Sequence, residues 1–437
     1  MFIYNLRLAL LSLKRDPVLT ALMVGAVAIG IGMSTTTLAV FHSMSGNPIA
    51  YKNHQLYAVQ LDSWSPNRPY SDPDEPPTQV TYRDGQALMQ AAKAQHQNLS
   101  FVSAMVLQTD KPDMKPDLVV ARVTYNDFFS MFDVPFEYGS PWGKDADQNA
   151  EQVVVLDQEY NEKLFGGANS VGKEIILNNR RFRVVGVLKK WDPIPKFYDL
   201  ENDAFGDPED VFIPFNLVSS MQLHSNGNNS CWGNPPGDNS FQSYLNSECV
   251  WLQFWAELPT SADRDAYHAF LDAYVQEQKK LGRFPRPLNN HLRDVGEWLE
   301  YNHVVSKDSR ALVGLSFMFL AVCILNTIGL ILAKFLRRSG EIGLRRAVGA
   351  SKLALFRQYL VESGVIGVSG GLFGVGLGWL GLIGVRHLIR NSDHIARLDW
   401  SMVGLSLLIA LAASLFAGLY PAWRVVRIPP AIYLKVQ

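Results

Sequence analysis

Residues 311–333 read ALVGLSFMFLAVCILNTIGLILA, a stretch of 23 residues with no formal charge. Three similar uncharged stretches lie at residues 17–51, 363–385 and 400–423. A helix needs about 20 mainly apolar residues to cross the hydrocarbon core of a bilayer. The sequence therefore predicts a membrane protein with four transmembrane helices, one before a long polar segment and three after it.

Charge is distributed unevenly between the membrane part and the polar segment. Residues 52–309 hold 23 basic and 36 acidic side chains, whereas residues 1–51 and 310–437 are both net basic. The whole-chain net charge of −1 and mean hydropathy of zero hide this contrast. The composition thus indicates a basic membrane part joined to an acidic domain.

Basic residues near the membrane helices predict the topology, because Lys and Arg accumulate on the cytoplasmic side. They precede the first helix, crowd the connection between the second and third helices, and follow the fourth: Arg7, Lys14, Arg15, Lys334, Arg337, Arg338, Arg345, Arg346, Lys352, Arg357, Arg424, Arg427 and Lys435. Three arginines in the short third connection oppose the rule but are outnumbered. We therefore expect both termini and the second connection to be cytoplasmic and the acidic domain to lie outside.

The expected domain boundaries follow from these stretches. They are a cytoplasmic amphipathic lead-in (1–16), transmembrane helix 1 (17–42), an outer domain (43–309), transmembrane helix 2 (310–335), a cytoplasmic connection (336–357), transmembrane helix 3 (358–386), a short outer loop (387–399), transmembrane helix 4 (400–424) and a cytoplasmic tail (425–437). The basic start of the chain also suits a signal peptide, but an apolar stretch longer than the usual ~7–15 residues favours a retained helix. The lead-in is expected to lie along the inner membrane surface.

The outer domain shows mixed α/β patterns. Strand patterns at 55–61, 118–125 and 250–257 alternate with helical patterns at 81–95 and after a Ser261 cap. This order predicts a two-layer α/β core at about 50–130 and 250–290. The fold class is thus α-helical membrane protein with a large α/β (α+β) domain between helices 1 and 2.

A more β-rich lobe is expected at about 131–249, inserted into that core. It contains a strand at 153–156, a helix capped by Asp157, and a hairpin of 174–177 with 180–188 around Asn178-Asn179. Residues 290–309 are expected to form a helical stalk that leads into transmembrane helix 2. Cys231 and Cys249 flank a polar loop on the oxidising side, so a disulfide is favoured over two free thiols.

Patterns typical of enzymes are present but lack the context that their chemistry requires. Residues 167–173 match a phosphate-binding loop, but Glu174 replaces the Ser or Thr that would bind magnesium. Residues 367–371 match a nucleophile turn, but they lie inside an apolar span that offers no base. The acidic run at 199–210 is expected to be a solvated loop rather than a calcium site. We therefore expect no enzyme activity, no metal site and no nucleic-acid partner.

Helix packing explains the glycines of the third span better. Gly370, Gly374 and Gly378 are spaced four residues apart, which allows helices to approach closely in lipid. Asn326 in the second span is a further candidate for helix packing.

The second cytoplasmic connection carries the most specific motif: Glu341-Ile342-Gly343-Leu344-Arg345-Arg346-Ala347-Val348-Gly349-Ala350-Ser351. It resembles the signature of the MacB/FtsX-like permeases of ABC transporters. The resemblance extends to Asn326, to the Gly-rich third span after Glu362, to the tail motifs at 420–424 and 428–431, and to outer-domain segments such as 128–129, 153–156, 164–166, 171–173 and 184–187. One departure is Arg337, where the family commonly has an acidic residue.

Physically, the motif suits a docking helix. Ile342, Leu344 and Val348 are expected to seat in a groove of a partner while Glu341, Arg345 and Arg346 contact its rim. A lipid-bound basic loop would explain the arginines but not the apolar residues or the two glycines.

The resemblance implies a permease subunit of the bacterial inner membrane, whose outer domain is periplasmic and whose second connection couples to an ATPase. Its implied partners are a cytoplasmic ABC ATP-binding subunit, a second permease in a homo- or heterodimer, membrane lipid, and a periplasmic adaptor with an outer-membrane channel. ATP and magnesium are expected in the ATPase, which we expect to be a separate subunit, and no cofactor in this chain. Export of a periplasmic substrate is the first hypothesis. The alternatives are a regulator of a periplasmic cell-wall hydrolase and a lipoprotein-releasing permease.

Overall fold

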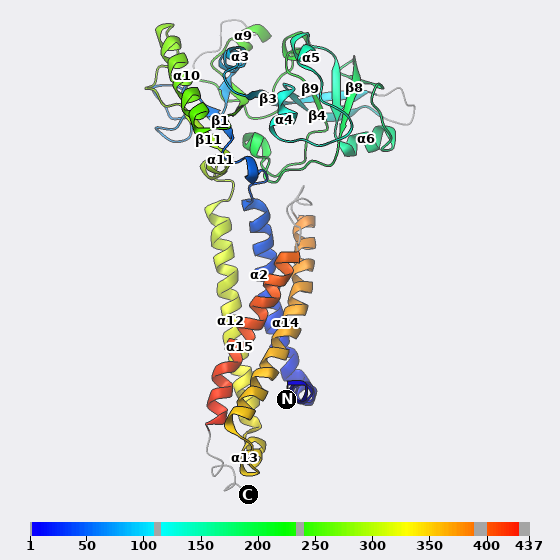
Figure 1. The fold of residues 1–437 in the computed structure, drawn as a ribbon, viewed down its shortest axis with the longest axis vertical. Helices are drawn as coiled ribbons and strands as arrows, with labels where there is room; N and C mark the ends of the chain where they lie inside the picture. The colour runs from blue at the N-terminus through cyan, green and yellow to red at the C-terminus, as the bar shows by residue number, and fades with distance from the viewer. Residues whose placement is uncertain (1, 109–114, 233–239, 389–399, 428–437) are drawn as a thin grey trace. The chain divides into compact units, whose positions relative to one another are not determined.

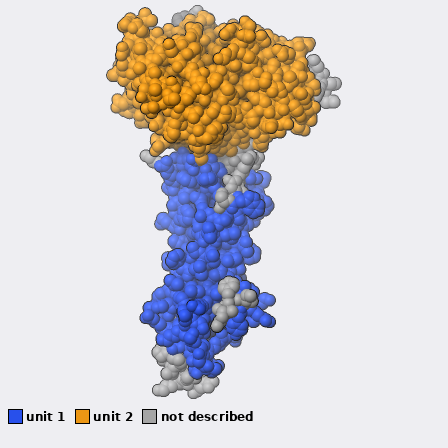
Figure 2. All heavy atoms as spheres, viewed as in Figure 1, with its two compact units in different colours: residues 1–45, 305–437 blue, residues 46–304 orange. Residues whose placement is uncertain are grey.

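The computed structural model describes residues 2–108, 115–232, 240–388 and 400–427. The chain divides into two compact units, a membrane unit of residues 1–45 and 305–437 and an outer unit of residues 46–304 (Figure 2). Residues 389–399 of the expected third connection and 428–437 of the expected tail lie outside the described residues.

Four helices of the membrane unit are long and apolar enough to cross a bilayer, which confirms the four predicted spans. They are α2 (Pro17–Ser45), α12 (Lys307–Arg337), α14 (Lys352–Leu388) and α15 (Trp400–Val426) (Figure 1). The helix α1 (Phe2–Arg15) precedes α2, and the short helix α13 (Ser339–Ala347) connects α12 to α14.

The glycines of α14 lie against α2. A Cβ atom added to Gly370 would lie 2.7 Å from Val27 Cγ1, and one added to Gly374 would lie 2.8 Å from Ile31 Cβ. Small residues at four-residue spacing therefore let the two helix backbones approach closely. A Cβ atom on Gly378 would likewise lie 3.2 Å from Thr35 Cβ.

Asn326 does not share this role. It is exposed on α12, whereas Cys323 and Thr327 of the same helix are buried. Because neighbouring positions of a helix point in different directions, the buried stripe of α12 passes beside Asn326. The expected packing role of Asn326 is therefore not seen within this unit.

The outer unit is built on one 11-stranded sheet with the order β11-β1-β10-β3-β4-β9-β6-β8-β5, in which β2 pairs with β10 and β7 pairs with β3 and β8. The strands are β1 (Leu56–Gln60), β2 (Val80–Thr81), β3 (His96–Gln108), β4 (Asp117–Thr124), β5 (Phe136–Gly139), β6 (Val153–Leu156), β7 (Glu174–Leu177), β8 (Arg180–Leu188), β9 (Val211–Pro214), β10 (Val250–Glu257) and β11 (His291–Asp294). The helices are α3 (Tyr82–Ala91), α4 (Asp127–Met131), α5 (Lys144–Gln148), α6 (Gln158–Phe165), α7 (Leu200–Asp203), α8 (Leu217–Met221), α9 (Phe241–Leu245), α10 (Ser261–Lys280) and α11 (Val295–Tyr301).

The long strand β3 joins the two halves of this sheet. Its first residues pair with β10 and its later residues pair with β4, both in antiparallel register. The expected β-rich insertion at 131–249 holds β5 to β9, and because β9 pairs in parallel with β4, the insertion extends the same sheet. Most of β3 is buried on both faces, so its sequence lacks the alternation that marks a half-exposed strand.

Two other expectations need correction. Residues 290–309 are not one helical stalk, since His291–Asp294 form β11, which pairs with β1, and the short helix α11 (Val295–Tyr301) ends before α12 begins at Lys307. The cap of α10 is Thr260 rather than Ser261, because the Thr260 hydroxyl accepts a hydrogen bond from the Asp263 amide. In contrast, Asp157 caps α6 as expected.

The acidic run is not a solvated loop throughout. Asp199 and Glu209 are 1% and 0% exposed, and both form ion pairs with the fully buried Arg122, Asp199 at 2.5 Å. Burial alone would raise the pKa of Glu209, but Arg122 and Lys196 outweigh it and lower that pKa to about 2. A buried arginine on β4 therefore explains why these carboxylates turn inward.

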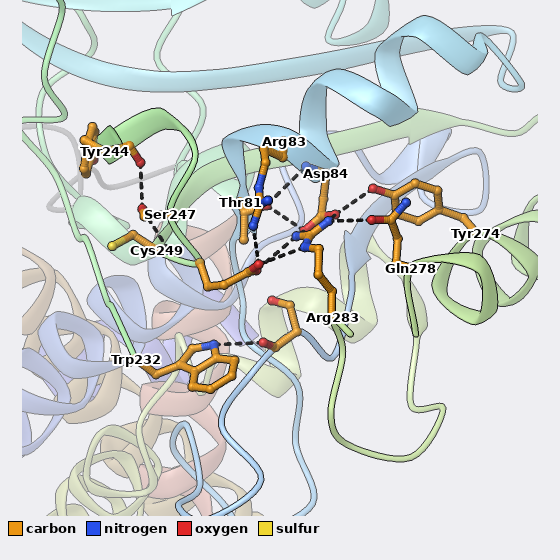
Figure 3. A network of polar contacts seen from close by, with 12 residues as sticks. Thr81, Arg83, Asp84, Trp232, Tyr244, Ser247, Cys249, Tyr274, Gln278 and Arg283 are labelled. Carbon is orange, nitrogen blue, oxygen red and sulfur yellow. Dashed lines mark hydrogen bonds and ion pairs between the residues drawn. The ribbon is translucent and has the colours of Figure 1, made fainter. Parts of the chain in front are cut away.

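A second ion network lies beside the disulfide that joins Cys231 and Cys249. Arg283 forms ion pairs with Asp84 of α3 at 2.8 Å and with Glu248 at 2.8 Å (Figure 3). Asp84 is 1% exposed and also accepts a hydrogen bond from Tyr274 of α10 at 2.7 Å. The network therefore links α3 and α10 to the segment that carries the disulfide.

Candidate functional site

The predicted docking motif folds into α13 and the turn that follows it. Glu341–Ala347 lie in α13, Val348 is its C-cap, and Gly349 has a φ of +106°. Only glycine adopts that conformation without strain, so Gly349 lets the chain turn into α14. Ser351 then accepts a hydrogen bond from the Ala354 amide at 3.1 Å and caps the start of α14.

One side of α13 is apolar and uncovered. Leu344 is 58% exposed and Val348 is 82% exposed, and Ala347 is exposed beside them. Residues three and four apart lie on the same side of a helix, so these three side chains form one patch. We call Leu344, Ala347 and Val348 the docking patch.

The charged residues of the motif contact this chain rather than standing free at the rim. Arg345 pairs with Glu341 at 2.6 Å and donates to Gln358 of α14 at 3.3 Å. Arg346 donates to the carbonyl oxygen of Val426 on α15 at 3.3 Å. The structure therefore uses both arginines to fix α13 against α14 and α15, which the sequence did not predict.

A buried polar cluster lies beneath α13 and includes α1. Lys334 of α12 and Glu362 of α14 form an ion pair at 2.6 Å, and Ser12 of α1 donates to Glu362 at 2.6 Å. Arg338 donates to the Ser12 carbonyl oxygen at 3.1 Å and to the Asp16 carboxylate. The lead-in is thus joined to α12 and α14 through these contacts.

One signal of this cluster is visible in the sequence. Ser12 and Asp16 interrupt the apolar and basic pattern of the first 16 residues, and Glu362 is the single acidic residue of α14. Such residues need polar partners when they are buried. Ser12 and Glu362, and likewise Asp16 and Arg338, are more than 300 residues apart in the sequence, so spacing alone does not identify these pairs.

The two segments that match catalytic motifs lie in other structural contexts than those motifs require. Residues 167–173 lie between α6 and β7, the reverse of the strand-to-helix order of a phosphate loop, and residues 367–371 lie inside α14. Among the described residues, no group of three or more His, Cys, Asp or Glu side chains could hold a metal ion.

These features define a polytopic membrane protein with an α/β domain inserted after its first span. A MacB-like periplasmic core domain matches residues 20–272, and an FtsX-like permease C-terminal domain matches residues 313–430. The chain belongs to the MacB/FtsX-like family of ABC transporter permeases.

Individual relatives are distant. The chain is 25% identical over 250 residues to the macrolide export ATP-binding/permease protein MacB of Neisseria meningitidis, which covers 57% of this chain and 33% of that protein. It is 25% identical over 313 residues to the pyoverdine export ATP-binding/permease protein PvdT of Pseudomonas aeruginosa. That alignment covers 71% of this chain and 41% of PvdT. The chain thus spans 33–41% of the length of these relatives.

A solved structure aligns with part of the chain. It is the periplasmic region of MacB from Actinobacillus actinomycetemcomitans, with a TM-score of 0.36 and 13% identity. The alignment covers 56% of this chain and 92% of that structure.

Proposed function

We propose that this chain is the permease subunit of a MacB/FtsX-type ABC transporter. An ABC ATP-binding subunit, which holds ATP and magnesium, docks on α13, and its ATP-driven closure moves the outer unit. The observation that carries the proposal is the docking patch, an uncovered apolar surface of Leu344, Ala347 and Val348 on a helix that hydrogen bonds join to α14 and α15. An exposed apolar patch of this kind is typical of a protein interface.

In this proposal the chain itself catalyses no reaction. The protein lies in the bacterial inner membrane with α13 in the cytoplasm and residues 46–304 in the periplasm, as the basic residues near the spans indicate. A cysteine at Ser351 would then be protected from an impermeant thiol reagent in intact cells, whereas a cysteine at Ser261 would react. The reverse labelling would overturn the proposed topology.

Two physical connections support the transfer of movement from α13. The first is the direct chain link to α12, because Arg338 lies between the two helices. The second is the cluster of Ser12, Asp16 and Arg338, which ties α1 to the same point. Because α1 continues into α2, a displacement of α13 would act on two spans that lead to the outer unit.

Export of a periplasmic substrate is the activity that we propose for the assembly. MacB and PvdT are both named export proteins, one for macrolides and one for pyoverdine, and both match a large part of this chain. The working assembly would contain two permeases, together with a periplasmic adaptor and an outer-membrane channel.

Substitutions in the docking patch test this proposal. Leu344→Asp and Val348→Asp place a charge in the proposed apolar contact without removing an ion pair. We expect each to reduce recovery of the ATP-binding subunit with the purified chain at least about tenfold, since desolvating an unpaired charge costs several kcal/mol. ATP hydrolysis by the complex should fall in parallel.

Leu281→Asp is the matched control. Leu281 is 74% exposed but lies in the outer unit, so this variant should retain the ATP-binding subunit. If Leu344→Asp and Val348→Asp also retain it with unchanged hydrolysis, α13 is not the docking site.

A further inference from the structure

A cleft in the outer unit lies where α3, the start of β3, α4 and α5 meet. Its volume is about 310 Å³, within the usual range of about 300–1,000 Å³ for sites that bind small molecules. Met89, Ala92 and Ala94 give it an apolar wall, and polar groups line the rest. None of the motifs in the sequence pointed to this place.

Asp147 of α5 is the most deeply buried charge in the lining. Its side chain accepts hydrogen bonds from the Trp142 indole at 2.7 Å and from the Asn126 backbone amide at 2.9 Å, and the residue is 4% exposed. The side chain of Asn216, another lining residue, donates to the backbone carbonyl oxygen of Asp147 at 2.7 Å. The carboxylate is therefore held in one orientation, and each of its oxygens accepts one of these bonds and has a further lone pair.

Gln97 supplies an independent sign of a missing ligand. It lines the cleft, is 5% exposed, and donates from its side-chain nitrogen to the carbonyl oxygens of Leu88 at 3.0 Å and Met89 at 2.7 Å. These two bonds fix which end of the side-chain amide is nitrogen. Its side-chain oxygen has no partner among the described residues, and a buried acceptor without a donor is unfavourable.

The charges around the cleft favour a positive ligand. Asp127 of α4 is a second lining carboxylate, and its Oδ2 lies 3.4 Å from both His96 Nδ1 and the Gln97 backbone nitrogen. The one lysine in the described lining, Lys144, is exposed at the edge. The buried groups without enough partners, the Asp147 carboxylate and the Gln97 side-chain oxygen, are therefore hydrogen-bond acceptors. A ligand must supply hydrogen-bond donors to them.

We propose that this cleft binds a small organic cation, a primary amine with a short apolar arm. Its ammonium group would donate to Asp147, Asp127 and the side-chain oxygen of Gln97, and its arm would contact Met89, Ala92 and Ala94. The proposal goes beyond ATP coupling. It does not depend on docking at α13, because its test uses only the full chain and a small molecule and needs no ATP-binding subunit.

The expected pH dependence agrees with this assignment. Burial raises the pKa of Asp147 to about 6, nearby Asp127 also raises it, and Lys144 lowers it. The carboxylate is thus mostly ionised at pH 7.5 and mostly protonated at pH 5. Binding of a cation should weaken about tenfold between these values, because a proton then competes for the same site.

Calorimetric titration of the full-length chain in lipid nanodiscs tests the proposal with two probes. L-Leucinamide carries the amine and a branched apolar arm, and N-acetyl-L-leucinamide has the same arm without the charge. We expect saturable binding of L-leucinamide and at least tenfold weaker binding of the acetylated compound. Absence of saturable binding, or equal binding of both compounds, overturns the proposal.

Two variants identify the site. Asp147→Asn should weaken binding of L-leucinamide at least tenfold, whereas Asp157→Asn, which changes a half-buried carboxyl outside the cleft, should not. If Asp147→Asn fails to fold, Asp127→Asn offers the same test at a side chain that is 15% exposed. An equal loss for Asp157→Asn, or unchanged binding by the cleft variants, overturns the assignment of the site.

Discussion

Lys334 of α12 and Glu362 of α14 form an ion pair at 2.6 Å, with side chains that are 1% and 2% exposed. Ser12 of α1 donates to the same carboxylate oxygen at 2.6 Å. Removing one partner of a buried pair leaves an uncompensated charge, whereas removing both does not. This pair and Ser12 therefore link α1, α12 and α14.

Glu362→Gln should destabilise the membrane unit by about 3–5 kcal/mol, because Lys334 is then buried without a countercharge. The measurement is thermal unfolding of the purified chain in detergent. The double variant Lys334→Met with Glu362→Gln should recover most of that loss. Equal destabilisation of the single and double variants would show that the pair is not the source of the stability.

Gly374→Ala should cost about 1–3 kcal/mol, since the new Cβ atom would lie 2.8 Å from Ile31 Cβ and would force α14 away from α2. Gly376 is the matched control, because no atom of another segment lies within 4 Å of the place that its Cβ would take. Gly376→Ala should be neutral or stabilise the helix by up to about 1 kcal/mol. Similar unfolding temperatures for the two variants would contradict the close approach.

The sequence predicted well whatever depends on local patterns. The spans follow from uncharged stretches, and the β7–β8 hairpin follows from Asn178 and Asn179, which both adopt positive φ. The close helix contact of the α14 glycines likewise follows from their spacing. In each case the physical requirement is met within a few neighbouring residues.

Long-range partners could not be predicted in the same way. In the sequence, nothing distinguishes Arg122 from other arginines in strands. Only the fold brings Asp199 and Glu209 into contact with it. Asp147 and Gln97 come from segments with no recognisable motif, and only the fold brings them to one cleft. The prediction of a helical stalk at 290–309 was wrong because β11 forms a strand by pairing with β1, which lies more than 200 residues earlier.

The outer unit should be more stable at pH 5 than at pH 7.5. Burial raises the pKa of Asp147, Asp157 and Asp210 to about 6 each, above the ordinary value of 3.8. The folded state therefore binds more protons than the unfolded state between those values, and the stability present below pH 4 is lost as pH rises through 6. Three groups oppose this trend: burial lowers the pKa of His291, Arg122 and Lys196 lower the pKa of Glu209, and Lys163 lowers the pKa of Asp117.

Thermal unfolding of the purified chain, followed by tryptophan fluorescence at both pH values, measures this dependence. Asp157→Asn keeps a good helix cap at α6 and removes one of the carboxyls with a raised pKa, so the difference between the two pH values should shrink. A higher unfolding temperature at pH 7.5 than at pH 5 would contradict the prediction.

Asp16 and Arg338 should be strongly coupled in a double-mutant cycle. Their side chains are 20% and 17% exposed, and Arg338 also holds Ser12, so Asp16→Asn, Arg338→Gln and the double variant should give a coupling of about 1–3 kcal/mol in unfolding free energy. The pair of Arg15 and Glu341 is the control, because it is longer, at 3.5 Å, and Arg15 is 72% exposed. Its cycle should give less than about 1 kcal/mol, as surface ion pairs do.

If α1 transfers movement from α13, Asp16→Asn should also retain the ATP-binding subunit while abolishing the ATP-dependent change of a fluorophore at a Ser261→Cys site. Loss of the subunit instead would assign Asp16 to docking, and an unchanged fluorescence response would remove α1 from the path of movement.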